Sequence, residues 1–176
     1  MAVSRSWTRC AAVAAAALLG AAAPGTAPAH AGSSTAVQCK GTESVTYRPG
    51  VTFAPRNVEI TTEGRFTTCA DSAGEVTSGA YGERFTVFAG CNDLLGDFKD
   101  RRTVKWSTGE SSVIDATGNS TAVAGQVITT ITGTVEKGRY QGRSVVQTVT
   151  LPQPDLLQCL STGLTGATGV TTLSIG

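Results

Sequence analysis

The residues after position 31 contain no long run of helix-forming residues, and this restricts the fold more than any other feature of the sequence. Thr, Ser, Val and Gly dominate there, a composition of β-branched residues and turn formers that favours strands. Several short runs alternate between apolar and polar residues, as strands with one buried face do. In chain order, the expected strands cover residues 43–48, 57–69, 80–91, 103–106, 112–114, 123–135, 143–151 and 169–175.

Short connections join most of these strands to their neighbours in the sequence. We expect turns at residues 49–55, 107–110, 118–119 and 137–142. A bulge is expected at Gly64, and a short helical turn at residues 155–159. Sequential hairpins without intervening helices predict an all-β fold of about eight antiparallel strands. An up-and-down barrel is favoured because closure removes exposed edges, and a two-sheet sandwich is the alternative.

The first 31 residues have the pattern of a cleavable secretory signal. Arg5 and Arg9 form a basic start, an apolar run covers residues 11–23, and Ala29 and Ala31 supply a small-residue cleavage motif. The apolar run is shorter than the about 20 residues that a helix needs to cross a bilayer, so no membrane span is expected. The sequence therefore predicts an extracellular protein with a signal peptide at 1–31, a flexible N-terminal tail at 32–37 and a single domain at 38–176.

Removal of the predicted signal peptide leaves four cysteines and no histidine. The remaining cysteines are Cys39, Cys69, Cys91 and Cys159. An even number of cysteines in an exported protein predicts two disulfides. Zinc is the competing interpretation, but no two cysteines have close ligand spacing, and His30 is removed with the signal. No metal site and no cofactor are therefore expected.

The positions of the turns favour one of the three possible disulfide pairings. The turn-forming segment 49–55 lies midway between Cys39 and Cys69. A hairpin about this segment brings these two cysteines face to face at its open end, which leaves Cys91 to pair with Cys159. The prediction is thus Cys39–Cys69 and Cys91–Cys159.

The charge pattern and the missing histidine argue against several classes of function. Arg5 and Arg9 belong to the predicted signal, so 12 of the 14 basic residues remain beside 13 acidic ones, a net charge of −1. The basic residues are scattered, whereas a nucleic-acid partner would need a basic face. Without histidine or a free thiol, Ser-His-Asp and Cys-His sites are impossible. The protein is predicted not to be an enzyme, with no catalytic residue assigned and no nucleic-acid partner.

The densest group of acidic residues is Asp93, Asp97 and Asp100. Carboxylates of this kind could hold Ca²⁺ or serve a carboxylate-dependent hydrolase. Their spacing matches no known ligand loop, and Lys99 and the pair Arg101-Arg102 dilute their charge. A solvated loop is the favoured interpretation.

Two aromatic residues are candidates for a binding surface. Trp106 alternates with Val104 on an expected strand, which favours a place in the core over contact with a ligand. Tyr140 lies at the tip of the expected turn at residues 137–142, where an exposed ring could anchor a partner. Packing of Tyr140 back onto the sheet is the favoured alternative.

Several segments resemble small secreted all-β proteins of streptomycete-type actinobacteria, a group with no assigned function. An Ala-rich signal that ends in Ala-x-Ala is similar to those of high-GC actinobacteria. The other segments that carry the resemblance are Cys39–Thr42, Val45–Thr52, Trp106–Ser112, Gly133–Gly142 and Asp155–Cys159. The resemblance implies an extracellular β-domain and supplies no activity or site.

Three functions remain open from the sequence. The leading hypothesis is a secreted non-enzymatic domain that binds a small ligand or a cell-surface component. The second is a module that binds an extracellular protein, such as a protease inhibitor presenting residues 70–78 or the Tyr140 hairpin. The third is a hydrolase that uses Asp93, Asp97 and Asp100.

Overall fold

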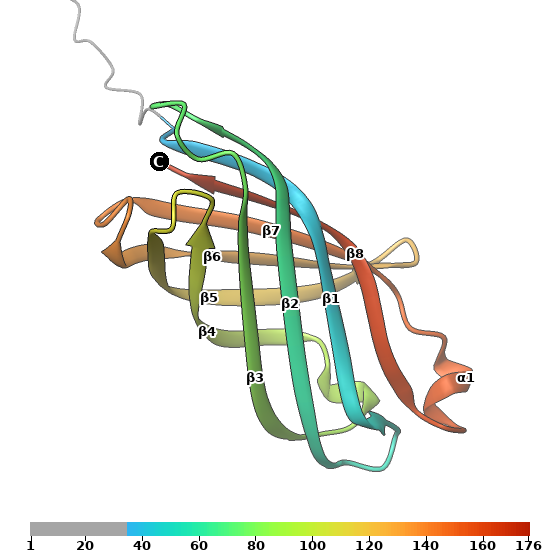
Figure 1. The fold of residues 1–176 in the computed structure, drawn as a ribbon. Helices are drawn as coiled ribbons and strands as arrows, with labels where there is room; N and C mark the ends of the chain where they lie inside the picture. Colours follow the sequence, from blue (N-terminus) through green and yellow to red (C-terminus); the bar gives the residue numbers. More distant parts are fainter. Residues whose placement is uncertain (1–34) are drawn as a thin grey trace, which may run out of the picture. The chain divides into compact units, whose positions relative to one another are not determined.

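A computed structural model describes residues 35–176, which form an eight-stranded antiparallel barrel (Figure 1). Each strand pairs with its neighbours in sequence, and β8 closes the barrel against β1. The elements are β1 (Val37–Val51), β2 (Arg56–Asp71), β3 (Gly79–Ala89), η1 (Cys91–Asp93), β4 (Gly96–Trp106), β5 (Ser111–Val123), β6 (Gln126–Gly138), β7 (Ser144–Pro152), α1 (Leu156–Cys159) and β8 (Leu164–Ile175). The predicted all-β class and the favoured up-and-down barrel are confirmed. The predicted signal peptide and residues 32–34 lie outside the described residues.

The predicted tail at residues 32–37 ends earlier than expected. Val37 is the first residue of β1, and Ala36 and Val37 are both buried. The backbone N–H of Ala36 donates to the carbonyl oxygen of Ile175 at 2.7 Å. Pairing with the last strand therefore draws the end of the predicted tail into the barrel.

The predicted turn at residues 118–119 is wrong, because both residues lie inside β5. The ring of Phe98 lies over Gly118, where a Cβ atom would stand 2.1 Å from Phe98 Cζ. Glycine thus makes room for an aromatic ring on the neighbouring strand. The turn itself lies at Ala124 and Gly125, whose φ angles of 49° and 79° are typical of a tight hairpin.

The bulge predicted at Gly64 is also misplaced. The register of β1 and β2 shifts between Lys40 and Gly41, opposite Thr67, and Gly64 itself pairs regularly. The ring of Tyr81 lies against Gly64, where a Cβ atom would stand 2.0 Å from Tyr81 Cζ. Here too, glycine admits an aromatic side chain from the next strand.

The two ends of the barrel are filled differently. The end where β1 begins and β8 ends, the closed end, holds the larger apolar cluster, which includes Phe66, Trp106, Ile114, Leu173 and Ile175. The end where β1 ends and β8 begins, the mouth, has a smaller cluster of Val51, Val58 and Leu164. Figure 1 shows α1 and the β5–β6 turn at the mouth. Most of the buried apolar side chains of the barrel interior therefore lie toward the closed end.

Pairing between β3 and β4 is limited to the closed end. The two ladder pairs are Gly79 with Trp106 and Ala80 with Lys105. The remainder of each strand pairs on its other side only, β3 with β2 and β4 with β5. This β3–β4 seam is the point where the barrel wall is least continuous.

Both predicted disulfides are confirmed. Cys39–Cys69 joins β1 to β2, and Cys91–Cys159 joins η1 to α1 at the mouth. Two disulfides indicate folding in an oxidising environment. Between residues 35 and 176, no helix is long and apolar enough to span a membrane.

Candidate ligand-binding pocket

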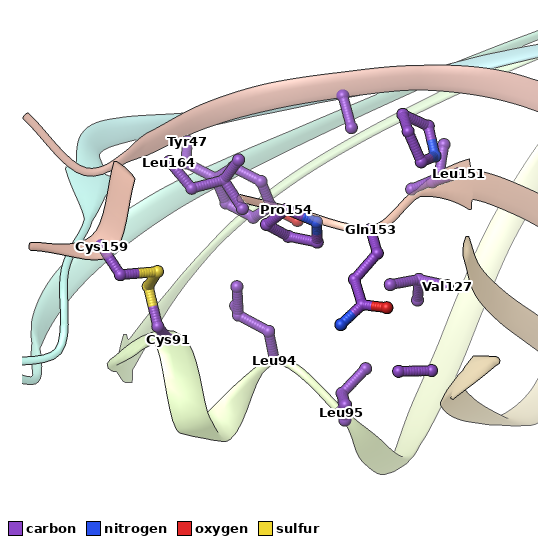
Figure 2. A pocket seen from close by; sticks show the side chains of 13 residues that line it. Tyr47, Cys91, Leu94, Leu95, Val127, Leu151, Gln153, Pro154, Cys159 and Leu164 are labelled. Carbon is purple, nitrogen blue, oxygen red and sulfur yellow. A yellow bond between two sulfur atoms is a disulfide. The ribbon is translucent and has the colours of Figure 1, made fainter. Parts of the chain in front are cut away.

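An apolar pocket of about 110 Å³ lies at the mouth of the barrel (Figure 2). For comparison, an apolar cavity of about 150 Å³ binds benzene. The lining residues are Tyr47, Cys91, Leu94, Leu95, Ala122, Val127, Leu151, Pro152, Gln153, Pro154, Cys159, Leu164 and Ala167. The pocket has room for one ring or for the end of an alkyl chain.

The alternation of the strands explains which side chains form the wall. Tyr47, Ala122, Val127, Leu151 and Ala167 each occupy an inward position near the mouth end of a strand, two residues or a multiple of two from a buried residue of the same strand. Two of the five are alanines, whose short side chains leave unfilled the space that larger residues occupy at the closed end. Small side chains on the strands therefore leave space beneath the segments that cover the mouth.

Two connections cover the mouth, and the Cys91–Cys159 disulfide links them. One is the segment from Gly90 to Leu95, in which the Asp93 side chain accepts a hydrogen bond from the Gly90 N–H at 2.8 Å. The other runs from Pro152 through α1, where Asp155 caps the helical turn by accepting from the Leu157 N–H at 2.9 Å. Figure 2 shows the disulfide on one side of the pocket and Val127 and Leu151 on the opposite side. The cross-link holds both covering segments in place.

Two polar groups enter this apolar space. Burial, together with the nearby negative charge of Glu43, raises the pKa of Tyr47 to about 12. The Tyr47 hydroxyl therefore keeps its proton at physiological pH and can donate it to a ligand. The side chain of Gln153 extends into the pocket with its amide toward Leu95 and Val127 (Figure 2). A few polar groups within an apolar wall are typical of small-molecule sites.

A layer of buried polar residues lies inside the barrel. Tyr81 Oη donates to Glu43 Oε2, and Gln147 Nε2 donates to Tyr81 Oη at 2.6 Å. Arg102 donates to Gln147 Oε1 at 3.0 Å and to Asp100 Oδ1 at 2.9 Å. The Nε atom of Arg102 also lies 2.8 Å from Asp100 Oδ2, so the guanidinium and the carboxylate face each other side by side. These groups contact one another and are closed off from solvent, which indicates a structural role.

Two carboxyl groups of this layer, those of Glu43 and Glu83, have raised pKa values. Burial raises the pKa of Glu43. Burial also raises the pKa of Glu83 to about 7, against the opposing influence of Arg102. One guanidinium, that of Arg102, thus lies among three carboxyl groups, those of Glu43, Glu83 and Asp100.

Sequence reasoning missed both the pocket and the polar layer. A signal for the layer was present, because Asp100 and Arg102 share the inward face of β4 with Val104 and Trp106 at a spacing of two residues. For the pocket, alternation identifies the wall residues on the strands. The covering segments carry no such periodic signal.

The structure brings Trp106 and Tyr140 together, but as parts of the core. Trp106 is 4% exposed, and its Nε1 donates to Ser112 Oγ at 2.8 Å. Tyr140 is half-buried and donates from its hydroxyl to Asp71 Oδ1 at 3.0 Å. The two rings meet edge to face with centroids 5.7 Å apart. These contacts are the ones that the packing alternative expects for Trp106 and Tyr140.

The three aspartates of the hydrolase hypothesis have separate roles. Asp93 caps η1, Asp97 accepts from Asn119 Nδ2 at 2.7 Å on the outer surface, and Asp100 pairs with Arg102 inside the barrel. In residues 35–176, no group of three or more His, Cys, Asp or Glu side chains is arranged to hold a metal ion. The three carboxylates therefore do not come together in one site, and the structure gives the hydrolase hypothesis no support at these residues.

Comparisons with protein-family models, with curated proteins and with solved structures find no match to this chain. The pocket at the mouth combines a mostly apolar lining with two covering segments that a disulfide holds together.

Proposed function

We propose that this protein is an exported, non-enzymatic barrel that binds a small apolar ligand, or the apolar end of a larger one, at its mouth. The observation that carries the proposal is the apolar pocket beneath two disulfide-linked covering segments. The signal-like residues 1–31 and the two disulfides support export and an extracellular location. The resemblance to streptomycete-type secreted proteins is consistent with this proposal.

The chemistry of the pocket defines the ligand. Its apolar wall favours an aromatic ring or an alkyl end, and the Tyr47 hydroxyl and the Gln153 amide favour a single hydroxyl or carbonyl group on that ligand. A ligand the size of toluene should bind with about −4 to −5 kcal/mol, a Kd of about 0.2 to 1 mM. Larger ligands would extend beyond the mouth.

Methyl NMR spectroscopy tests the proposal directly. Toluene, and in a second titration 1-decanol, is added to the folded, disulfide-intact protein with labelled Leu, Val and Ile methyl groups. We expect saturable shifts at Leu94, Val127, Leu151 and Leu164, which line or border the pocket, and none at Ile175 of the closed end. Absence of saturable shifts at the pocket methyl groups, or equal shifts at both ends, would contradict the proposal.

A matched pair of variants on β8 provides the control. Ala167→Leu fills the pocket and should abolish the toluene shifts, because residue 167 faces the interior. Thr168→Leu adds the same side chain at the adjacent, outward position and should leave them unchanged. Both variants are checked for the native far-UV circular dichroism spectrum.

A second candidate function has one observation in its favour. The segment between β2 and β3 is exposed from Ser72 to Glu75 and is held at its base, since Asp71 accepts from the Glu75 N–H at 3.0 Å. Arg139 Nη2 adds an ion pair with Glu75 at 2.7 Å. A fixed, exposed segment of this kind fits a protease inhibitor. Inhibition of a secreted protease that is lost on deletion of residues 72–75 would support this alternative, and no inhibition across a protease panel would reject it.

A further inference from the structure

Large exposed apolar side chains gather at the mouth of the barrel. Seven of the nine in the described chain belong to this end, namely Phe85, Phe88, Leu95, Phe98, Val123, Leu157 and Leu160. Of the other two, Val146 lies near the start of β7, opposite Ser174, and Val170 lies in the middle of β8. Large apolar side chains that gather at one place on a surface usually mark an interaction site.

The closed end carries the opposite surface chemistry. Arg139 forms ion pairs there with Asp71, Glu75 and Glu110. Among the exposed large apolar side chains of residues 35–176, Val146 is the one that lies toward that end, opposite Ser174. The mouth therefore exposes more large apolar side chains to solvent than the closed end does.

Five of the apolar residues line the pocket or lie close along the chain to residues that line it, and we name them the mouth rim. They are Phe88, Leu95, Val123, Leu157 and Leu160. Leu95 itself lines the pocket, and each of the other four lies within three residues of a lining residue: Cys91, Ala122 or Cys159. The apolar surface is thus continuous along the chain with the apolar cavity.

We infer that the mouth rim docks onto a lipid surface and that the pocket then receives the apolar end of a lipid from it. The second half of this inference rests on the proposed ligand-binding function, whereas docking does not. Phe88, Leu157 and Leu160 are 72%, 68% and 73% exposed, so most of each side chain is accessible from solvent. Protruding apolar side chains insert into the boundary between headgroups and acyl chains.

Charge at the mouth is balanced, which defines the kind of lipid surface. Arg48 and Arg56 are exposed near the rim, and so are Asp93 and Asp155. Because neither sign is in excess among these residues, apolar contact and not attraction to anionic headgroups drives docking. The protein should bind vesicles of zwitterionic lipids, which carry no net charge, and its affinity for them should depend little on salt concentration.

Flotation with phosphatidylcholine vesicles tests docking. The exported protein, with disulfides intact, should float with the vesicles in 0.1 M and in 0.5 M salt. The variant Phe88→Ser/Leu157→Ser/Leu160→Ser should lose at least about tenfold in vesicle affinity, because three inserted side chains are removed. The control Val146→Ser/Val170→Ser removes apolar side chains from the barrel wall and should stay within about twofold of the parent protein. Thermal unfolding confirms that each variant is folded.

The two halves of the inference are separated by combining flotation with the toluene titration. The rim variant should lose flotation and keep the toluene shifts at Leu151, whereas Ala167→Leu should keep flotation and lose the shifts. No flotation of the parent protein, with toluene shifts intact, overturns docking and leaves the proposed function standing. Equal flotation of the rim and control variants also overturns it. Flotation without toluene shifts overturns the ligand assignment and supports docking alone.

Discussion

Arg102 of β4 and Glu83 of β3 form an ion pair across the seam of the barrel, with 3.5 Å between Nη2 and Oε2. The backbone ladder between these strands ends at Ala80 and Lys105. Continued in register, that ladder would place Glu83 opposite Arg102. Side-chain contact therefore joins the two strands directly beyond the point where their backbone hydrogen bonds stop.

The protonation of Glu83 should make stability depend on pH. Burial raises its pKa from 4.5 to about 7, with Arg102 opposing the shift and Asp100 and Glu43 adding to it. Since the folded state then binds a proton more tightly than the unfolded state, this contribution to stability is complete below pH 4.5 and is lost as the pH rises through 7. The free energy of unfolding should fall with pH across this interval, by up to about 1.4 kcal/mol per pH unit for one proton.

Urea unfolding at pH 4.5, 5.5, 6.5 and 7.5 measures this dependence. Glu83→Gln keeps the side chain uncharged throughout and should reduce the slope. Glu59→Gln is the control, because Glu59 makes only a 4.0 Å ion pair with an exposed arginine. The same slope in Glu83→Gln and in the parent protein would show that other groups cause the pH dependence.

Arg102 should be far more important to stability than its neighbour Arg101. Arg102→Met removes the guanidinium that faces Asp100, Glu83 and Glu43 and leaves their carboxyl groups buried without a counter-charge. The expected loss is about 3 to 5 kcal/mol. Arg101→Met breaks an ion pair with Glu136 on the surface and should cost less than about 1 kcal/mol. Urea unfolding at pH 7.5 compares the two, and similar losses would argue against a structural role for the polar layer.

Several parts of the fold could be predicted because each has a local cause. Alternation and turn residues identify most of the strands, and the midpoint of Cys39 and Cys69 identifies their hairpin. The polar layer departs from the usual apolar interior, so a search for apolar alternation alone does not include Glu43 or Asp100. The pocket could not be predicted, since it depends on how two irregular segments cover the mouth.

The misplaced turn and bulge share one physical origin. Gly64 and Gly118 were interpreted as breaks in local structure, but each lies within a strand and faces an aromatic ring of the next strand. At each position, a contact with a residue distant in sequence therefore leaves room for glycine alone. A single sequence contains no local signal that separates such a glycine from one in a turn.

Gly64 should not tolerate even a methyl group. In Gly64→Ala, the new Cβ atom would lie 2.0 Å from Cζ of Tyr81, so the ring has to move away from Glu43 and Gln147. We expect a loss of about 2 to 3 kcal/mol, typical of overpacking with strain on neighbouring contacts. Gly82→Ala is the matched control on the adjacent strand, where the nearest atom is 3.8 Å away. Thermal unfolding measures both, and equal melting temperatures would contradict the close packing of Tyr81 on Gly64.

The two disulfides should differ in their effect on the pocket. Cys91→Ala/Cys159→Ala releases the two covering segments and should cost about 4 kcal/mol of stability in the chain-entropy model, for a loop of 68 residues. It should also weaken toluene binding, because the segments that carry Leu94 and Gln153 are no longer held together. Cys39→Ala/Cys69→Ala opens a loop of 30 residues and should cost a similar amount while leaving toluene affinity intact, because this bond links β1 to β2 apart from the pocket.

Urea unfolding and the methyl titration, both at a temperature where each variant is folded, separate these effects. Loss of toluene binding in the Cys39/Cys69 variant alone, or in both variants equally, would show that general stability and not the covering segments determines the affinity. A selective loss in the Cys91/Cys159 variant would identify the mouth disulfide as the bond that maintains the pocket. The distinction holds because the two bonds lie in different parts of the barrel, one between neighbouring strands and one between the segments that cover the pocket.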